Sequence, residues 1–503
     1  MDPVLILVNI IALVVVVIWS YIKNKYSYWK NRRVPYTKPS LPYGNLKGVG
    51  KGIHTREFFS DIYEKFKHQT PFVGTYFFTE PVAVVTNFEL AQNILIRDSN
   101  TFQDRKEYYN ENEEPLTAHM AYLGGEKWRQ LHQKFEPLFK PNRMMQIMPT
   151  ILEISDRLAT ILEPMAETGE PVEIMPVLGS FSMDIAGSII LGIKCNCLLD
   201  PNCEFQAKSE RISVNPRQSE LRRIFMQTYP KIARLFNMRT LFDDVSEYFI
   251  KVIPDEVKER GANSGQRGDL MDLMVQLKNT GKLDDSSEHF GNLTDDEVLA
   301  QAFLFFMTSV ETISTTLGSG IYQLTMHEDI QEQLRSEILD VLSKTGGQVT
   351  YDAIMKMIYL HQFVDEILRL HSPANHLIRK AAQDYKVPGT EHVIEKGTTV
   401  FIPISAFHCD PDVFPDPLVF NPDNFSSTAV AGRHPCAYLP FGEGPRGCIG
   451  TQMGKLVVYA GLVKILRKYR VKFSDLTPLN LSYVNSIHGL RTTADYFPEF
   501  EKL

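Results

Sequence analysis

The sequence predicts a mostly α-helical protein with small peripheral β-sheets, carried on an N-terminal membrane helix. Apolar patterns of helical length fill most of the chain, and the first residues form one long apolar run. Strand character is confined to FVGTYFF with EPVAVVT near residue 80, VIEKGTTVFIPI near residue 400, and a possible pair between Tyr469 and Arg491. Because strands and helices do not alternate regularly, a doubly wound sheet is disfavoured.

The N-terminal run VLILVNIIALVVVVIWSYI, residues 4–22, is apolar except for Asn9 and Ser20 and is long enough to cross the hydrocarbon layer. Asp2 supplies no basic n-region and no small-x-small site follows, which favours a membrane helix over a cleaved signal peptide. Lysines and arginines behind the run place the rest of the chain in the cytosol by the positive-inside rule. We therefore expect an anchor at residues 1–22, a basic flank and proline-rich hinge at 23–45, and one large domain at 46–503.

The composition excludes some classes of protein. The chain has 503 residues of which 44% are hydrophobic, enough to fill a sizeable core. A net charge of -7 and a pI near 6.0 give no basic field for nucleic acid, so we expect no nucleic-acid partner. Six cysteines are too few for a disulfide framework and fit a reducing compartment. Cys195, Cys197 and Cys203 cluster without a CxxC pair, which favours plain packing over a metal site.

A long buried helix is predicted from about Thr294 to Thr316. Thr294 and Glu297 have the spacing of a capping box, which marks the start of the helix. LAQAFLFFMTSV is apolar on nearly all sides, so this helix must cross the interior. Four polar side chains interrupt the run and either bond to the helix backbone or line an internal cavity. They are Thr308, Ser309, Glu311 and Thr312.

The loop PFGEGPRGCIG, residues 440–450, places one cysteine among several glycines. Glycine permits backbone conformations and close approaches that a Cβ forbids. A thiolate offered from such a loop suits the axial position of haem iron, and Arg446 is placed to pair with a propionate. We therefore interpret Cys448 as a metal ligand rather than an inert buried thiol.

Phe441, Gly444, Arg446, Cys448 and Gly450 reproduce the motif FxxGxRxCxG, and by this motif the chain resembles the cytochrome P450 superfamily. EILR resembles the family's ExxR and FNPDNF is similar to its PERF region, and both occur in the expected order. GEKWRQ, VETISTT and AFHCDPDVFPDPLVF extend the resemblance over essentially the whole chain. YWKNRRVPY and KCNCLLDPNCEF are most similar to the insect microsomal branch associated with detoxification.

The resemblance implies a role for each matching residue. Cys448 would be the thiolate ligand of haem b iron, and Glu311 with Thr312 would be the catalytic acid–alcohol pair that delivers protons to bound dioxygen. The implied cofactor-binding residues are Trp128, His132, Phe441, Arg446 and Gly450, and the implied structural residues are Glu366, Arg369 and Asn424. Substrate contacts are expected at Phe102, Phe305, Phe306, Val310, Asn375 and Ile487.

Three features depart from the family's pattern. A small residue and a glycine usually precede the acid–alcohol pair, but Thr308 and Ser309 stand here and add hydroxyls and volume to the oxygen pocket. The arginine expected after Trp128 is His132, and the PERF arginine is Asn424. We therefore expect altered oxygen activation, one changed propionate contact, and an ExxR network that is weaker or differently made.

The resemblance implies a membrane-bound haem-thiolate monooxygenase that oxidises lipophilic xenobiotics or endogenous lipids and terpenoids. It would lie at the endoplasmic reticulum as a single-pass protein in contact with membrane lipid, with residues 46–503 as the haem-containing catalytic domain facing the cytosol. Electrons would come from NADPH through NADPH–cytochrome P450 reductase, with cytochrome b5 as a further partner, because the sequence shows neither a second domain nor a GxGxxG strand–helix unit that would bind nicotinamide.

Two other readings of the function stay open. One is a haem-thiolate enzyme that catalyses a dehydration or rearrangement without inserting oxygen. The other is a haem protein that only binds a lipophilic ligand. The basic residues Lys127, Arg129 and Lys134 fit either a docking face for the reductase or an ordinary solvated helix.

Overall fold

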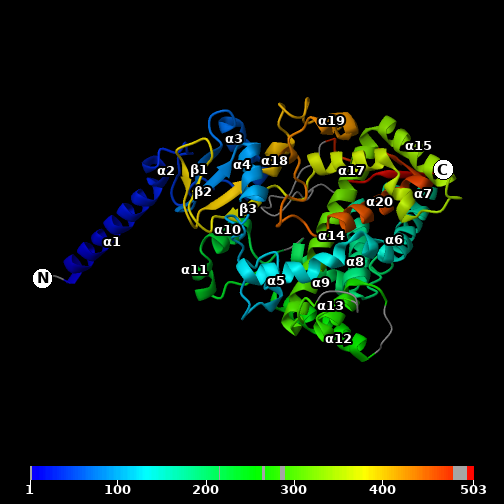
Figure 1. Cartoon of the computed structure of the whole chain (residues 1–503), viewed down its shortest axis with the longest axis horizontal. Helices are drawn as coiled ribbons and strands as arrows, with labels where there is room; N and C mark the ends of the chain where they lie inside the picture. The colour runs from blue at the N-terminus through cyan, green and yellow to red at the C-terminus, as the bar shows by residue number, and fades with distance from the viewer. Residues whose placement is uncertain (1–2, 214–215, 263–266, 284–288, 480–495) are drawn as a thin grey trace.

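The computed structural model describes residues 3–213, 216–262, 267–283, 289–479 and 496–503. These residues form a mostly helical body with small sheets, from which one long helix projects (Figure 1), and this confirms the predicted fold class. The longer helices are α1 (Pro3–Tyr26), α3 (Thr55–Phe66), α5 (Gly125–Phe135), α6 (Pro141–Ile161), α8 (Ile174–Ala186), α9 (Glu204–Ser213), α10 (Glu220–Thr228), α12 (Asp243–Ala262), α13 (Leu270–Thr280), α14 (Asp295–Met326), α15 (Glu328–Ser343), α17 (Ile358–Leu370) and α20 (Thr451–Lys468).

Helix α14 forms the centre of the body and packs against α8, α12, α17 and α20. It begins as predicted, because the Glu297 N–H donates to the Thr294 hydroxyl at 3.1 Å and the Glu297 carboxylate accepts from the Thr294 N–H at 2.9 Å. The helix continues to Met326, so the predicted end near Thr316 is wrong. The added turns stay buried, and the missing side chain of Gly320 lets Ile367 of α17 pack against the backbone.

A four-stranded sheet joins segments that are far apart in the sequence. Its order is β1-β2-β6-β3, in which β2 and β6 are parallel and the other neighbours antiparallel. The strands predicted near residues 80 and 400 are therefore confirmed and lie side by side. The strands are β1 (Phe72–Phe77), β2 (Glu80–Val85), β3 (Leu377–Lys380), β4 (Tyr385–Lys386), β5 (Val393–Ile394), β6 (Thr399–Ile402), β7 (Tyr469–Lys472) and β8 (Glu499–Lys502).

The strand predicted at Tyr469 is confirmed as β7, but its partner lies outside the predicted range. β7 pairs antiparallel with β8, in a register that places Tyr469 opposite Lys502. Residues 480–491 of the predicted range lie outside the described residues. The pairing holds the C-terminal strand against the end of α20, at the side of the body remote from α1 (Figure 1).

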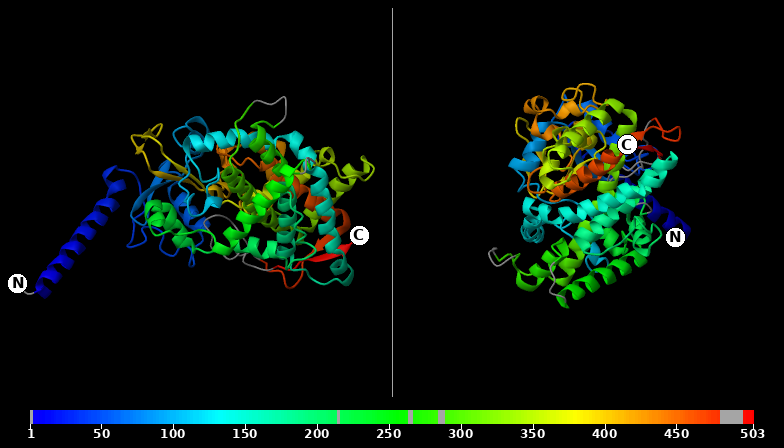
Figure 2. Two further views of the ribbon diagram at one scale, coloured as in Figure 1. Left: turned by 90° about the horizontal axis from the view of Figure 1, so that it is seen from below. Right: turned by 90° about the vertical axis from the view of Figure 1, so that its right-hand side faces the viewer.

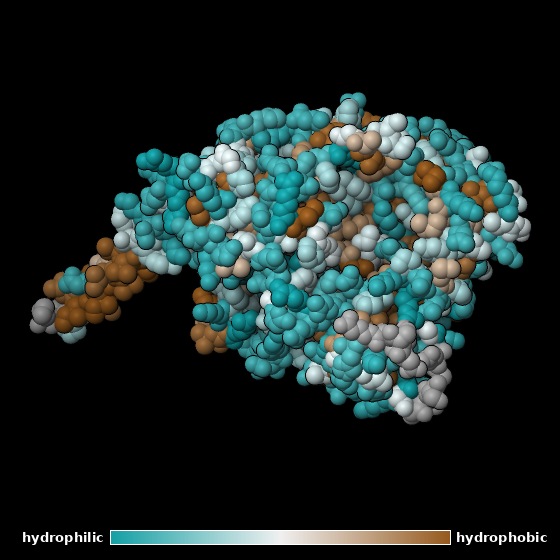
Figure 3. Space-filling model, viewed as in Figure 1, coloured by the Kyte–Doolittle hydropathy of each residue, from teal (hydrophilic) through white to brown (hydrophobic). Residues whose placement is uncertain are grey.

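Helix α1 projects from the body and none of its residues is buried (Figure 2). Its side chains form a mostly apolar surface (Figure 3). Within the described residues, three helical stretches are long and apolar enough to cross a membrane, but two of them, at Ile174–Leu191 and Asp295–Met326, are 72% buried inside the body. α1 is therefore the candidate membrane span that the sequence predicted.

The basic flank and proline hinge, residues 23–45, pack against β1. Trp29, in the short helix α2 (Tyr28–Asn31), is fully buried and its indole N–H donates to the Thr75 carbonyl at 3.0 Å. Its ring lies against Gly74, where a Cβ would overlap the indole. Val34 is buried beside it. The segment is held on the sheet because burying these apolar side chains is favourable.

Candidate active site

A cavity of about 600 Å³ lies beside the middle of α14. One wall comes from α14, a second from the loop that precedes α5, and a third from β3 and the residues before it. The cysteine loop, residues 440–450, closes the remaining side. Many of the lining side chains are apolar, among them Phe139, Phe305 and Leu377, so the cavity suits a flat apolar group and an apolar ligand.

The cysteine loop is folded so that its thiol opens into this cavity. The Cys448 N–H donates to the Phe441 carbonyl at 2.8 Å, which closes the loop on itself. Gly442 and Gly444 have φ of 69° and 72°, which L side chains rarely adopt, and a Cβ on Gly444 would overlap the Leu95 carbonyl oxygen. Cys448 lines the cavity, as predicted for a ligand. Cys436, by contrast, is fully buried in the core.

The surroundings of Cys448 leave the thiol without strong stabilisation of its anion. Burial raises the pKa of the Cys448 thiol, whereas the N–H of Gly450, the Thr451 hydroxyl and the charge of Arg105 act in the opposite direction. A metal cation bound to the sulfur would reverse this balance, because coordination deprotonates a thiol.

Three guanidinium groups line the cavity without a carboxylate partner. Among the described residues, Arg105, Arg379 and Arg446 make no ion pair with any acid, and Arg379 is buried with its Nη2 unpartnered. Burial and the neighbouring Arg105 lower the pKa of Arg446 to about 9, and burial with the other two arginines lowers the pKa of Arg379. Arg379 and Arg446 are buried, and buried cations require anions. The two propionates of haem supply them, so the residues present fit haem.

Arg446 is also held by neutral contacts. Its guanidinium donates to the carbonyls of Gln103, Met120 and Leu123 at 2.7, 3.0 and 2.6 Å, and lies 4.0 Å from the ring centroid of Trp128. Trp128 lines the cavity from α5. These contacts fix the 119–123 turn on the cysteine loop.

His132 takes the place of an arginine and supplies no equivalent charge. Its ring packs against Trp128 with centroids 5.2 Å apart and lines the cavity. Burial lowers its pKa, so the imidazole is neutral near neutral pH. The cationic contacts are instead offered by Arg105 and Arg379, which were not singled out in the sequence because no local pattern marks them.

The remaining cofactor candidates also lie at the cavity. Phe441 and Gly450 line it from the two ends of the cysteine loop. Phe441 packs on the edge of the main hydrophobic core, and Lys455 of α20 lies 5.8 Å from its ring centroid. The structure therefore brings Cys448 together with every residue proposed for cofactor binding.

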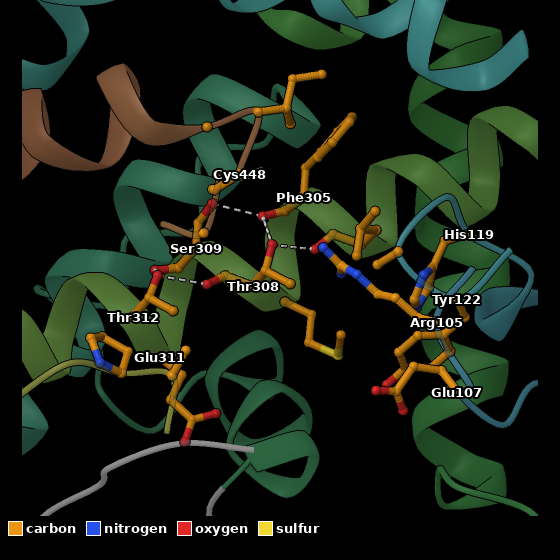
Figure 4. A pocket seen from close by; sticks show the side chains of 18 of the residues that line it. Arg105, Glu107, His119, Tyr122, Phe305, Thr308, Ser309, Glu311, Thr312 and Cys448 are labelled. Carbon is orange, nitrogen blue, oxygen red and sulfur yellow. Dashed lines mark hydrogen bonds between the residues drawn. The ribbon is translucent and has the colours of Figure 1, made fainter. Parts of the chain in front are cut away.

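The hydroxyls of α14 both bond to the helix and line the cavity. The hydroxyls of Thr308, Ser309 and Thr312 donate to the carbonyls four residues earlier at 2.8, 2.7 and 2.7 Å. In Figure 4, Ser309 and Thr312 lie at the same end of the view as Cys448, whereas the Glu311 carboxylate points away from the cysteine. These hydroxyls therefore bond to the helix backbone and also line the internal cavity, so both predicted alternatives hold.

The ExxR residues form a fully buried pair on α17. Nε and Nη2 of Arg369 donate to the two oxygens of Glu366 at 2.7 and 2.8 Å. Glu366 also accepts from the Asn421 N–H at 2.9 Å and from the side-chain amide of Asn424 at 3.1 Å. The network is thus made with an amide donor at 424, differently from the family's pattern.

The expected substrate residues separate into two groups. Phe305 lines the cavity, with ring centroids 5.3 Å from Phe135 and 5.2 Å from Phe139. The structure places the other described candidates away from the cavity lining, and Ile487 lies outside the described residues. Phe306 and Val310 are buried in the main core, Phe102 packs on Tyr385, and Asn375 is buried and bonded to Ser405.

A helical fold that presents a cysteine from a glycine-bearing loop into a buried cavity, beside arginines that lack acid partners, defines the haem-thiolate class. The family model for cytochrome P450 matches residues 34–496. The chain is 37% identical over 500 residues to cytochrome P450 6a2 of Drosophila melanogaster, covering 98% of this chain and 99% of that protein. It is 35% identical over 463 residues to cytochrome P450 6A1 of Musca domestica, covering 91% and 90%.

The chain therefore belongs to the cytochrome P450 family, with insect relatives as the sequence predicted. It is an oxidoreductase of the monooxygenase type. The family carries haem on a cysteine thiolate, which agrees with the fit of the cavity to haem.

Proposed function

We propose that this protein is a membrane-bound monooxygenase that oxidises lipophilic small molecules, with dioxygen and with electrons that come from NADPH through a separate reductase. The main supporting observation is that Cys448 lines a largely apolar cavity beside the hydroxyl-bearing turn of α14. Haem, when bound there, supplies the activation of dioxygen. The chain's own residues would bind the haem, orient the substrate and supply protons.

Each residue at the cavity has a proposed task. Cys448 holds the iron, while Arg446, with Arg105 and Arg379, pairs with the propionates. Trp128, His132, Phe441 and Gly450 shape the contact with the haem. The Thr312 hydroxyl, which lines the cavity, holds a proton donor in place for dioxygen, and Glu311 exchanges protons with the outside. The backbone bond of Thr312 fixes the direction in which its hydroxyl oxygen points.

The proposed substrate is a lipophilic xenobiotic or an endogenous lipid or terpenoid. Apolar side chains from several elements line the cavity, so most of a bound molecule would be desolvated against hydrocarbon. Phe305 is the best supported of the substrate contacts, because it alone among the described candidates lines the cavity. The proposal of a detoxifying role rests on the resemblance of YWKNRRVPY and KCNCLLDPNCEF to the insect microsomal branch.

We place the protein on the endoplasmic reticulum membrane with its body in the cytosol. α1 is the anchor, and the lysines and arginines that follow it favour the cytosolic orientation. A second exposed apolar surface, at α11 (Pro230–Leu235) and the next residue, supports a body that rests on the lipid. Its exposed side chains are Ile232 at 42%, Leu235 at 80% and Phe236 at 72%. Figure 3 shows a brown patch below the base of α1.

The proposed electron donor is NADPH–cytochrome P450 reductase, with cytochrome b5 as a second partner. The predicted docking cations give this little support. Lys127 pairs with Glu111 at 3.3 Å and Arg129 with Glu126 at 3.1 Å, and Lys134 donates to the Asn292 carbonyl at 2.8 Å. Paired surface charges attract a partner weakly, so the proposal of a reductase rests on the family.

One observation keeps a second candidate function in view. Thr308 and Ser309 add two hydroxyls to the cavity wall next to Thr312, and hydroxyls there change how dioxygen and water are held. A haem-thiolate enzyme that dehydrates or rearranges its substrate without inserting oxygen would tolerate this change. A haem protein that only binds ligand is the third candidate.

The test begins with the ferrous carbon monoxide spectrum of the membrane-bound protein beside its Cys448→Ser and Cys436→Ser variants. We expect a thiolate-type band in the wild type and in Cys436→Ser, and its loss in Cys448→Ser. NADPH consumption with reductase should rise on adding lipophilic compounds, with oxygen from isotopic dioxygen in the product. Product without the label would establish the non-oxygenating alternative, and a spectral shift without any product would indicate a binding protein.

A further inference from the structure

The wall of the cavity remote from Cys448 carries polar side chains that the haem site does not use. They are Glu107, His119 and Tyr122, here called the polar wall, and all three line the cavity. In Figure 4 they lie at the opposite end of the view from Cys448 and Ser309. Arg105 reaches from the same loop, but its guanidinium donates to the Arg446 carbonyl at 2.8 Å and belongs to the haem side.

The polar wall has hydrogen-bonding capacity to spare. The Tyr122 hydroxyl lines the cavity with no hydrogen-bond partner among the described residues. Nδ1 of His119 is buried without a partner. Glu107 accepts one bond, from the side-chain amide of Gln227, and forms no ion pair within the described part of the chain. Leaving buried polar groups unpaired costs free energy that a ligand with matching groups recovers.

The groups of the polar wall are suited to a neutral partner. Burial lowers the pKa of His119 to about 3, so its imidazole is uncharged, and burial raises the pKa of the Tyr122 phenol. Burial also raises the pKa of the Glu107 carboxyl, against the opposing effect of Arg105. Uncharged imidazole and phenol can each donate and accept a hydrogen bond, which matches a hydroxyl or carbonyl group.

The polar wall is held rigidly. His119 and Tyr122 belong to one turn, in which the Tyr122 N–H donates to the His119 carbonyl at 3.0 Å and the ring centroids lie 4.2 Å apart. The turn is fixed by the bonds from Arg446 to its carbonyls and by the Met120 N–H, which donates to Gln301 at 2.8 Å. A preorganised wall loses little entropy when a ligand binds.

From these observations we propose that the substrate is an oxygenated lipophile, a neutral apolar molecule with a hydroxyl or carbonyl group at one end. That group binds Tyr122, His119 and Glu107 while the apolar end lies toward Cys448. This inference rests on the proposed function for the reaction, but the binding itself does not require turnover. It also fixes an orientation, since oxidation then occurs at the end of the molecule away from the existing oxygen.

The test uses three probes that share the bicyclohexyl ring system: bicyclohexyl, 4-cyclohexylcyclohexanol and 4-cyclohexylcyclohexanecarboxylate. Dissociation constants are measured by equilibrium dialysis against the purified holoprotein and corrected for each probe's partition from water. We expect the alcohol to bind about tenfold more tightly than the hydrocarbon, as one to two hydrogen bonds to otherwise unpaired groups would give. The carboxylate should gain nothing comparable, because burying its charge is costly. The lining cations are already held, Arg105 by the Arg446 carbonyl at 2.8 Å and Arg223 by Glu220 at 3.9 Å.

Tyr122→Phe removes only the hydroxyl and should reduce the preference for the alcohol severalfold, and Glu107→Leu should do the same. The matched control is Tyr109→Phe, on the same loop but outside the cavity lining. Variants are compared only when they keep the thiolate-type band, which separates loss of recognition from loss of folding.

Affinities that follow hydrophobicity alone, or a preference for the alcohol that survives both substitutions, would overturn the inference. Tighter binding of the carboxylate would also overturn it and would assign an acid to the cavity instead. Failure to oxidise any probe would count against the proposed function but leave the binding result standing. Where turnover occurs, product analysis should place the new oxygen on the ring remote from the hydroxyl, and oxidation of the hydroxyl-bearing ring would contradict the orientation.

Discussion

The side-chain amide of Asn424 donates a hydrogen bond to Glu366 at 3.1 Å, at a position where the family pattern has an arginine. Arg433 donates to the Asn424 carbonyl and lies 4.3 Å from the ring centroid of Phe414 and 4.9 Å from that of Phe425. Arg433 therefore clamps the segment that completes the Glu366 network.

Replacing Arg433 with leucine should loosen that network. Two partly buried cation–π contacts and a hydrogen bond are lost, so we expect the free energy of unfolding to fall by about 2 kcal/mol. Haem content should fall with it. Urea unfolding and haem stoichiometry measure both, and Arg222→Leu on the surface of α10 is the matched control. Equal losses of stability and haem in the Arg433 and Arg222 variants would show that Arg433 does not support the Glu366–Arg369 pair.

Ser309→Gly should raise the product formed per NADPH consumed. The hydroxyl and Cβ of Ser309 occupy the cavity wall beside Thr312, and their removal restores space for dioxygen. The control is Ser314→Gly, whose hydroxyl donates to the Val310 carbonyl at 2.9 Å in the same helix but which does not line the cavity. Both changes cost the helix about 0.5 kcal/mol in propensity. Unchanged or lower coupling in Ser309→Gly would show that Ser309 does not perturb oxygen activation.

Gly444→Ala should abolish haem binding. The added methyl group meets the Leu95 carbonyl oxygen, and the positive φ of 72° is itself unfavourable for alanine, so the cysteine loop must shift. The control is Gly432→Ala, where a Cβ meets no atom within 4 Å and φ is -96°. Haem absorbance per protein, with a thiolate-type carbon monoxide band, measures the result. A fully loaded Gly444→Ala protein would contradict the proposed fit of the loop.

His408 should make stability depend on acid pH. Its Nε2 accepts the Leu439 N–H at 2.8 Å, so the proton lies on Nδ1, which donates to the Arg369 carbonyl at 3.1 Å. Burial lowers the pKa of His408 to about 3 from 6.5 in the unfolded chain. Between these values the unfolded state binds a proton that the folded state does not. The contribution of His408 is therefore complete above pH 6.5 and is lost progressively as the pH falls toward 3.

His408→Gln removes the imidazole that takes up this proton on unfolding. Below pH 6 the wild type should lose stability more steeply than the variant, by up to about 1.4 kcal/mol per pH unit. Urea unfolding at several pH values gives both slopes, and exposed His68→Gln should keep the wild-type slope. Parallel curves for wild type and His408→Gln would mean that the buried imidazole is protonated in the folded protein.

Short-range patterns carried most of what the sequence could predict. The capping box at Thr294 and the spacing around Cys448 depend on residues a few positions apart, and both are found at the expected places. Arg379 reaches the cavity only because β3 pairs with β6, a contact without a local signal. Phe305 and Phe306 are equally apolar neighbours on α14. The orientation of the helix about its own axis in the packed structure decides which one faces the cavity.

The burial of Trp29 against Gly74 fixes where the anchor can be removed. A shortened protein that begins just after Tyr26 keeps the indole in its slot on β1 and should remain folded without the membrane helix. One that begins at the proline run near Pro35 uncovers the edge strand β1 and leaves an apolar groove along it, a surface prone to aggregation. The natural limit of the body is therefore the start of α2 at Tyr28, within the basic flank. Shortened proteins made for solubility should begin at or just before Tyr28.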